Sequence, residues 1–292
     1  MRVGTRESRL AMRQTELFLQ AMAERNPDEE CEVVGMKAMG DIDLTSRLDE
    51  MPSVGAFVRE LDEALLDGRI DCSVNSLKDI PTTLPEGIVI GAMFPRDDPR
   101  DVIVPCPLED LPEGARVGTA STRRESILRD LRPDLDVRPL RGNIHTRLSR
   151  LDAGDFDAII LAKAGLDRMG LERPMHVLDP RVFVPAPAQG IIAVECRRDD
   201  DRTLGMLRRL DSMRSRLEAG AERGVMKMMQ AGCSSPVGVN ARVVEDGIHV
   251  DAVSYGYAEG PRRVSVDLPS DYVLDELLGI AEYLAGKRDV VI

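Results

Sequence analysis

The 292-residue sequence has no apolar run of the length that a membrane-spanning helix needs, about 20 residues. Its first residues, MRVGTRESRL, lack the apolar segment and the small-residue cleavage site of a secretory signal peptide. Neither a Walker loop nor a GxGxxG motif is present, so no ATP or dinucleotide site is predicted. We therefore expect a soluble, cytoplasmic protein with no membrane association.

Cysteine is scarce, and its spacing is not that of a disulfide framework or a zinc site. The five cysteines are odd in number, far apart and without a CxxC pair, so no disulfide and no metal site is predicted. Cys31, Cys72 and Cys196 lie in apolar, strand-like runs and are interpreted as small core residues. Cys106 lies between two prolines, which is typical of a connection. Cys233 differs, because the surrounding QAGCSSPVG predicts a loop around a thiol without an obvious partner.

Lysine is also rare, with five residues against 34 arginines, and the formal net charge is −12. This acidity argues against a general nucleic-acid-binding protein. Between residues 116 and 150, however, nine arginines outnumber four acidic residues, which gives a local charge of +5. A general preference for arginine explains its ratio to lysine but not this clustering. Because the guanidinium fork matches carboxylate and phosphate geometry, the segment is a candidate anion site.

Hydrophobic periodicity predicts an α/β fold. Strand-like runs alternate with amphipathic helices up to about residue 197, and a helix, three strands and a closing helix follow. The charged RDDPRD at 96–101 and the PAPAQG at 185–190 read as crossovers between two α/β lobes that enclose a ligand cleft. We expect a discontinuous first domain (1–94 and 191–209), an inserted second domain (95–190) and a small α+β third domain (210–292).

Three predicted strand-to-helix turns combine small polar residues with arginine. They are GTRES at 4–8, GTASTRR at 118–124 and RGNIHTR at 141–147. Free N–H groups and the helix dipole favour an anion at such a turn. One turn alone is typical of an ordinary N-cap, but three with arginine predict a ligand that carries several negative charges.

Two further residues are candidates for chemistry. Asp79, in NSLKDIP at 75–81, follows a predicted strand at the end where α/β folds place function. In an arginine-rich cleft this carboxylate could stabilise a cation or accept a proton. Cys233 could be a nucleophile, but none of the histidines (His145, His176 and His249) has a motif context, so a Cys–His dyad is weakly supported. A thiol permanently bonded to a cofactor fits the loop better.

These motifs resemble the hydroxymethylbilane synthase (porphobilinogen deaminase) family over essentially the whole chain. The segments that carry the resemblance occur in the family's order. They are GTRESRLA, GAFVRELDEALL, SVNSLKDIP, RDDPRDVIV, VGTASTRRES, RPLRGNIHTRLSRLDAGDFDAIILAKAGLDRMGL, PAPAQGIIAVECR and AGCSSPVG.

The resemblance implies two lobes like those of type II periplasmic binding proteins, with the active cleft between them, plus the small third domain. It implies a dipyrromethane cofactor joined by a thioether to Cys233. The implied reaction condenses four porphobilinogen molecules head to tail with loss of ammonia, so the partners are porphobilinogen and the growing pyrrole chain. A monomer is the implied state.

The resemblance also assigns roles to residues that match the family's motifs. Asp79 corresponds to the catalytic aspartate and contacts the cofactor. The carboxylates of the substrate and the growing chain are expected to bind Arg6, Ser8, Arg141, Arg147 and Arg168. The cofactor carboxylates are expected to bind Lys78, Thr119, Ser121, Arg123 and Arg124.

The sequence departs from the family's pattern at several places. Asn75 stands where many members have histidine, and Ala120 replaces a hydroxyl residue in the 118–124 turn. His145 replaces a smaller residue, and the segment 51–57 lacks a lysine that is often seen there. None of these departures removes Asp79, Cys233 or the arginine set.

A second hypothesis is a non-catalytic anion-binding protein with the same two lobes, such as a solute receptor or a regulator's effector domain. No signal peptide or helix-turn-helix segment supports that reading, and it gives no role to Cys233 or to the third domain. A cysteine hydrolase is a more distant alternative.

Overall fold

The structure is a computed structural model that describes residues 1–37, 58–232, 235–256 and 260–290. The chain forms two compact units. Unit 1 contains the described residues of 1–97 together with 190–216, and unit 2 contains those of 98–189 and 217–290. The expected division into three domains stays a prediction. In the part of the chain that the structure describes, no helix is both long enough and apolar enough to span a bilayer.

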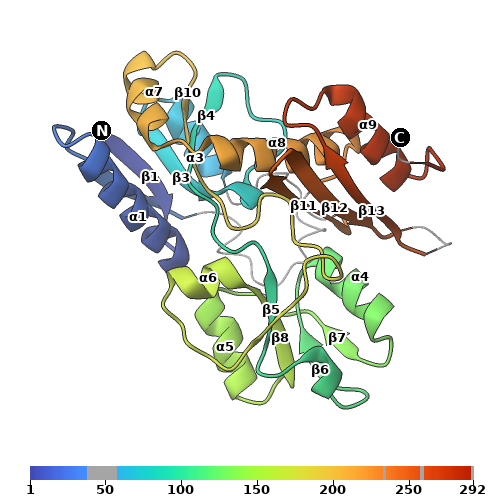
Figure 1. Cartoon of the computed structure of the whole chain (residues 1–292). Helices are drawn as coiled ribbons and strands as arrows, with labels where there is room; N and C mark the ends of the chain where they lie inside the picture. The colour runs from blue at the N-terminus through green and yellow to red at the C-terminus, as the bar shows by residue number, and fades with distance from the viewer. Residues whose placement is uncertain (38–57, 233–234, 257–259, 291–292) are drawn as a thin grey trace. The chain divides into compact units, whose positions relative to one another are not determined.

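Unit 1 is built on a mixed five-stranded sheet of order β2-β1-β3-β10-β4 (Figure 1). β1 runs parallel to both β2 and β3, whereas β10 is antiparallel to β3 and β4. The chain therefore leaves this sheet after β4 and returns from unit 2 to insert β10 between β3 and β4. The strands are β1 (Arg2–Arg6), β2 (Glu32–Met36), β3 (Cys72–Ser76), β4 (Ile88–Met93) and β10 (Ile192–Arg197).

Two apolar clusters cover the strands of this sheet. Val3 belongs to the cluster of α1, which buries Phe18 and Met22. Its neighbour Gly4 lies against the cluster of α3, because successive strand residues point to opposite faces; a Cβ on Gly4 would lie 2.4 Å from the Ile70 side chain. Glycine at this position therefore lets α3 pack closely. The helices are α1 (Arg9–Arg25), α3 (Arg59–Leu66), α7 (Asp201–Leu207) and the 3-10 turns η1 (Leu77–Asp79) and η3 (Arg208–Leu210).

Unit 2 contains a second mixed sheet with an equivalent arrangement, of order β7-β6-β8-β5-β9. β6 is parallel to β7 and β8, and β5 is antiparallel to β8 and β9. Each sheet has three adjacent parallel strands, of which the first in sequence (β1 or β6) lies between the other two. An antiparallel strand (β10 or β5) pairs with the third parallel strand. The elements are β5 (Asp101–Val104), η2 (Leu108–Asp110), β6 (Arg116–Gly118), α4 (Thr122–Leu131), β7 (Asp136–Arg138), α5 (Ile144–Asp152), β8 (Ala158–Ala162), α6 (Lys163–Arg168) and β9 (His176–Val177).

The C-terminal part of unit 2 is a three-stranded antiparallel sheet of order β11-β12-β13. Apolar residues of α8 and α9 pack on it in one cluster. Two buried carboxylates of α8 bind the edge strand β11: Glu222 accepts from Ala241 N at 2.6 Å, and Glu218 from Val243 N at 3.1 Å. The elements are α8 (Met213–Met228), β11 (Val237–Val244), β12 (Gly247–Ser254), β13 (Arg262–Leu268) and α9 (Leu274–Leu284).

The predicted fold class is confirmed: two mixed α/β sheets of like topology and a small α+β part. Local signals placed many elements well, since Ser8, Ser121 and Asn143 cap α1, α4 and α5 as their types favour. The strand β5 and the helix α7 were not expected. RDDPRD was interpreted only as a charged crossover, yet its last residue, Asp101, begins a buried strand.

Candidate functional site

The first group of predicted site residues gathers at one edge of the unit 1 sheet. Because β1 and β3 are parallel neighbours, their carboxyl ends lie at the same edge. Arg6 is the last residue of β1, and Lys78 and Asp79 form the turn η1 directly after β3. Arg6 Nη1 lies 3.8 Å from Asp79 Oδ2. The structure thus brings together an arginine and an aspartate that are distant in sequence.

Both members of this ion pair keep access to solvent. The side chain of Asp79 is 31% exposed and that of Arg6 is 16% exposed. The separation exceeds a hydrogen-bond distance. Asp79 is therefore held near a positive charge while one side of its carboxylate remains accessible to a ligand.

Short polar contacts fix the elements around this pair. Ser8 is the N-cap of α1, and its Oγ accepts from Ala11 N at 3.4 Å. Gln14 Nε2 donates to Ser76 Oγ at 2.8 Å, which ties α1 to the residue immediately before η1. Sequence reasoning did not find this contact of Gln14, because the partner of a helical glutamine is known only once β3 lies beside the helix.

Asn75, the departure next to this edge, has a buried structural contact. Its Nδ2 donates to Glu195 Oε2 at 2.9 Å and to Ser73 Oγ at 3.2 Å. Asn75 and Glu195 are 4% and 0% exposed, respectively. The amide therefore joins β3 to β10 below the edge that carries Asp79.

The second group of predicted residues follows the parallel strands of unit 2. Thr119 and Ser121 come after β6, Arg141 after β7, and Arg168 lies in α6 after β8. These strands end at one edge, because β6 is parallel to both neighbours. Two of the three predicted turns, 118–124 and 141–147, and Arg168 therefore follow strands that end at one edge of the unit 2 sheet.

Local hydrogen bonds order this second edge. Thr119 Oγ1 accepts from Ser121 N at 3.2 Å, and Ser121 Oγ accepts from Arg124 N at 3.4 Å. Arg147 Nε donates to Gly142 O at 2.7 Å, within the turn that begins α5. Ser121 thus serves as the N-cap of α4, as its type predicts, and Thr119 orders the turn before it.

Arg123 and Arg124 are buried around Asp101, which the sequence reasoning missed. Asp101 is 0% exposed and accepts from Arg123 Nη2 at 2.8 Å and Arg124 Nη2 at 2.7 Å. Gln189 Nε2 also donates to it at 2.8 Å. Burial alone would raise the pKa of the Asp101 carboxyl, but the two guanidiniums outweigh burial and hold that pKa well below its ordinary value.

One N–H group of this cluster is buried without a partner among the described residues. Arg123 Nη1 also donates to Val184 O at 2.6 Å, and Arg124 Nη1 to Ile160 O at 3.1 Å. Arg124 Nε is buried and has no hydrogen-bond partner among the residues that the structure describes. A buried N–H group without a partner is costly, so an oxygen of a bound anion would satisfy a real deficit. His145, a departure in the turn before Arg147, likewise has a buried Nε2 without a described partner.

The two groups belong to different units, and each is assembled within its own unit. Cys233 and the departure at 51–57 lie outside the described residues. Beside Cys233, Gly232 N donates to Ser235 Oγ at 3.1 Å, just before β11 begins. The predicted roles of the site residues remain predictions.

The chain is similar to several known proteins. Among solved structures, the periplasmic VFT2 domain of BvgS from Bordetella pertussis is similar over 72% of this chain and 86% of that one, with 16% identity and a TM-score of 0.42. The sulphonate binding protein SsuA from Escherichia coli is similar over 79% and 70%, with 17% identity and a TM-score of 0.39.

Comparison by sequence covers most of the chain. A family model described as "Porphobilinogen deaminase, dipyromethane cofactor binding domain" matches residues 1–205, and one described as "Porphobilinogen deaminase, C-terminal domain" matches residues 216–254. A protein from Methanopyrus kandleri named "Probable porphobilinogen deaminase" is 41% identical over 257 residues, which is 87% of this chain and 86% of that protein.

Proposed function

The chain belongs to the porphobilinogen deaminase family, and we propose that both polar edges described above contribute residues to its reaction. The chain is a transferase, a hydroxymethylbilane synthase. It condenses four porphobilinogen molecules head to tail with loss of ammonia and releases the linear tetrapyrrole hydroxymethylbilane. The reaction uses a dipyrromethane cofactor, which when bound supplies the pyrrole carbon that accepts the first substrate.

The observation that carries the proposal is the Arg6–Asp79 pair at the carboxyl edge of β1 and β3. Breaking the substrate's C–N bond sends its electron pair out with ammonia and leaves a positive methylene-pyrrole. Asp79 faces that charge and the pyrrole N–H groups, and it helps to remove the proton lost after the new C–C bond forms. At about 4 Å and an effective dielectric of about 20, such a charge pair contributes about 4 kcal/mol before desolvation.

Arginine forks bind the carboxylates. Every porphobilinogen carries an acetate and a propionate, so negative charge accumulates as the chain lengthens. Guanidinium groups recognise carboxylates through paired hydrogen bonds, and helix N-termini add N–H donors. The proposed binders of the substrate and of the growing chain are Arg6, Ser8, Arg141, Arg147 and Arg168.

The residues present suit the cofactor. Its carboxylates need buried N–H and hydroxyl donors, and Arg124 Nε is a buried donor without a described partner. Asp101 orients Arg123 and Arg124 through hydrogen bonds to one Nη2 group of each. We assign these carboxylates to Lys78, Thr119, Ser121, Arg123 and Arg124, and the covalent thioether to Cys233.

The remaining features of the proposal concern the cell and the assembly state. We propose a cytoplasmic monomer that binds neither nucleic acid nor membrane. The formal charge of −12 supports the absence of nucleic-acid binding, since it repels phosphates outside the arginine-rich segment. The non-catalytic alternative is not favoured, because the family match extends through residues 216–254.

Replacing Asp79 tests the catalytic assignment. The Asp79→Ala variant should fold normally and lose about 10³ in kcat, the rate equivalent of about 4 kcal/mol. Asp67→Ala removes an exposed carboxylate of the same unit, which contacts Arg69 Nη2 at 3.5 Å, and it should keep kcat unchanged. Steady-state assays with porphobilinogen give both values. Near-normal turnover of the Asp79 variant would remove its catalytic role.

Replacing Cys233 tests the anchor. Intact mass and a peptide map should find two linked pyrrole units on the Cys233 peptide of the wild type and none on Cys233→Ser. Cys106→Ser, which removes a free thiol elsewhere, should retain the full adduct. Full loading of the Cys233 variant would show that the anchor lies at another residue.

A further inference from the structure

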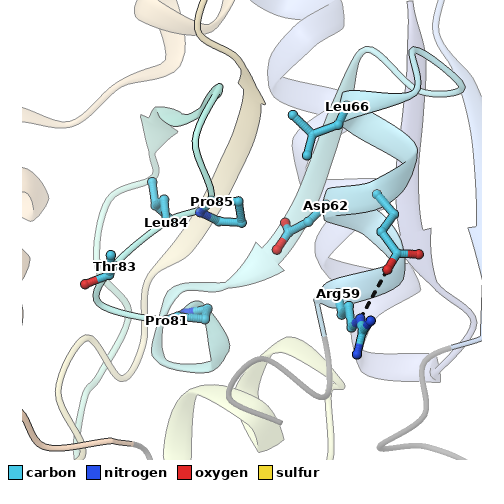
Figure 2. A pocket seen from close by; sticks show the side chains of 8 residues that line it. Arg59, Asp62, Leu66, Pro81, Thr83, Leu84 and Pro85 are labelled. Atoms are coloured by element: carbon cyan, nitrogen blue, oxygen red, sulfur yellow. Dashed lines mark hydrogen bonds and ion pairs between the residues drawn. The ribbon is translucent and has the colours of Figure 1, made fainter.

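A pocket of about 400 Å³ lies in unit 1 between α3 and the segment 81–85. Figure 2 shows its two walls, the helix on one side and the proline-bounded segment on the other. Most of its lining is apolar and comes from Leu66, Pro81, Leu84 and Pro85. Its volume lies in the range typical of small-ligand sites. The pocket contains none of the residues assigned to the reaction.

One carboxylate points into this pocket. Asp62, on α3, is 8% exposed, and Figure 2 shows its carboxylate directed towards the 81–85 segment. Its Oδ1 is buried and has no hydrogen-bond partner among the described residues. Burial, and then the charge of Glu63, raise the pKa of Asp62 to about 6. At neutral pH the group is mostly ionised, so the pocket contains a desolvated negative charge.

The charged neighbours do not neutralise Asp62. Arg59 Nε binds Glu63 Oε1 at 3.1 Å, and both of these side chains are more than half exposed at the rim. The segment 81–85, PTTLP, contributes no titratable side chain. Together the three charged residues of the lining have a net charge of −1, with the unbalanced charge on Asp62.

We propose that this pocket binds a small primary alkylammonium group. The ammonium donates to the Asp62 carboxylate, with the Thr83 hydroxyl as a second acceptor at the lining, and the alkyl part packs against Leu66 and Leu84. An ammonium group has only donors, which suits a carboxylate that has only acceptors. The apolar lining favours an amine that carries carbon over the bare ammonium ion. The same chemistry occurs in the aminomethyl group of porphobilinogen and in unrelated cellular amines.

Binding is measured on the 15N-labelled full-length protein by amide chemical shifts. Propylammonium chloride is titrated to about 50 mM at pH 8, with tetramethylammonium chloride replacing it so that ionic strength is constant, because millimolar affinity is expected for so small a ligand. We expect saturable shifts of amides in 60–66 and 82–84. Tetramethylammonium, which has no N–H donor, should produce none. No saturation, or equal shifts with tetramethylammonium, would overturn the proposal.

Two variants locate the effect. Asp62→Asn should raise the Kd for propylammonium at least about tenfold, whereas Glu63→Gln, which removes the same charge from the rim, should change it less than about threefold. Equal effects of the two variants would refute a specific role for Asp62. If Asp62→Asn does not fold, the wild type decides the matter: its affinity should fall between pH 8 and pH 5 as Asp62 is protonated. An affinity unchanged by pH would also refute the proposal.

A kinetic experiment distinguishes the aminomethyl group of porphobilinogen from an unrelated amine as the ligand. This experiment alone rests on the proposed function. If propylammonium raises the KM for porphobilinogen without changing kcat, the pocket receives the substrate's own ammonium group. If binding is saturable but leaves both constants unchanged, the ligand is another amine. An inactive preparation would remove only this experiment, because the chemical-shift titration does not require turnover.

Discussion

Replacing Asp101 with asparagine should lower the unfolding free energy of unit 2 more than the loss of an exposed ion pair would. The carboxylate is fully buried and accepts hydrogen bonds from two guanidiniums and from Gln189. Asparagine keeps the shape but removes the negative charge, and its amide group turns donors towards other donors. Two buried guanidiniums would then lack their counter-charge.

The magnitude follows from the contacts that remain. Removing one partner of a buried ion pair typically costs about 3–5 kcal/mol. Arg123 keeps its bond to Val184 O, and Arg124 keeps its bond to Ile160 O. We therefore expect a loss near the lower limit, about 3 kcal/mol. Because the pKa of Asp101 lies well below its ordinary value in the folded protein, this contribution is present above the unfolded pKa of about 4 and is lost only as pH falls below it.

The assay is native-state hydrogen exchange of the β5 and β8 amides, because a chain with two units need not unfold in one step. Asp155→Asn is the matched control: Asp155 binds Arg150 Nε at 2.9 Å with both side chains nearly half exposed, so its loss should be below about 1 kcal/mol. The difference between the variants should be constant from about pH 5 to pH 8. A loss for Asp101→Asn no greater than the control's would refute the reasoning.

Two other predictions concern buried carboxylates. The raised pKa of Asp62, about 6, means that the folded state binds more protons than the unfolded state between about pH 4 and pH 6, so its ionisation destabilises the fold as pH rises. Full conversion of the shift gives about 3 kcal/mol, which we reduce to about 1–2 kcal/mol because the carboxyl faces an open pocket. The unfolding free energy of Asp62→Asn relative to the wild type, measured with urea, should therefore rise by about 1–2 kcal/mol between pH 4.5 and pH 7.5. A difference that stays constant over this pH range would contradict the prediction. Glu222→Gln should cost about 2–3 kcal/mol, since Glu222 accepts from Ala188 N and Ala241 N and glutamine leaves one buried N–H facing a donor; a thermal unfolding curve identical to the wild type's would refute it.

The agreement between sequence and structure is best where the signal is local. The turn at 118–124 was expected to lead from a strand into a helix, and α4 spans Thr122–Leu131 with Ser121 as its cap. Three strands between two helices were expected in the C-terminal part, and β11, β12 and β13 lie there between α8 and α9. Capping, periodicity of 3.6 or 2 and turn residues act within a few positions of the chain. The local sequence therefore contains the signals that predict these elements.

The misses share a different cause. β5 begins with an aspartate in a run of charged residues, and charge normally excludes a residue from a strand interior. Asp101 is nevertheless buried, because Arg123, Arg124 and Gln189 converge on it from distant parts of the chain. Asn75 and Gln14 acquire their partners, Glu195 and Ser76, in the same way. No local pattern records such pairings.

The sequence alone determined the class of the fold, the family, the helix caps and the polar residues that follow strands. These depend on residue type and on neighbours within a few positions. Tertiary contacts place Arg6 beside Asp79 and Arg123 and Arg124 around one buried carboxylate. They also bury Asp62 Oδ1 without a hydrogen-bond partner among the described residues. Partner choice depends on strand order, and desolvation on what packs around a group. Both arise only when segments far apart in sequence are brought together.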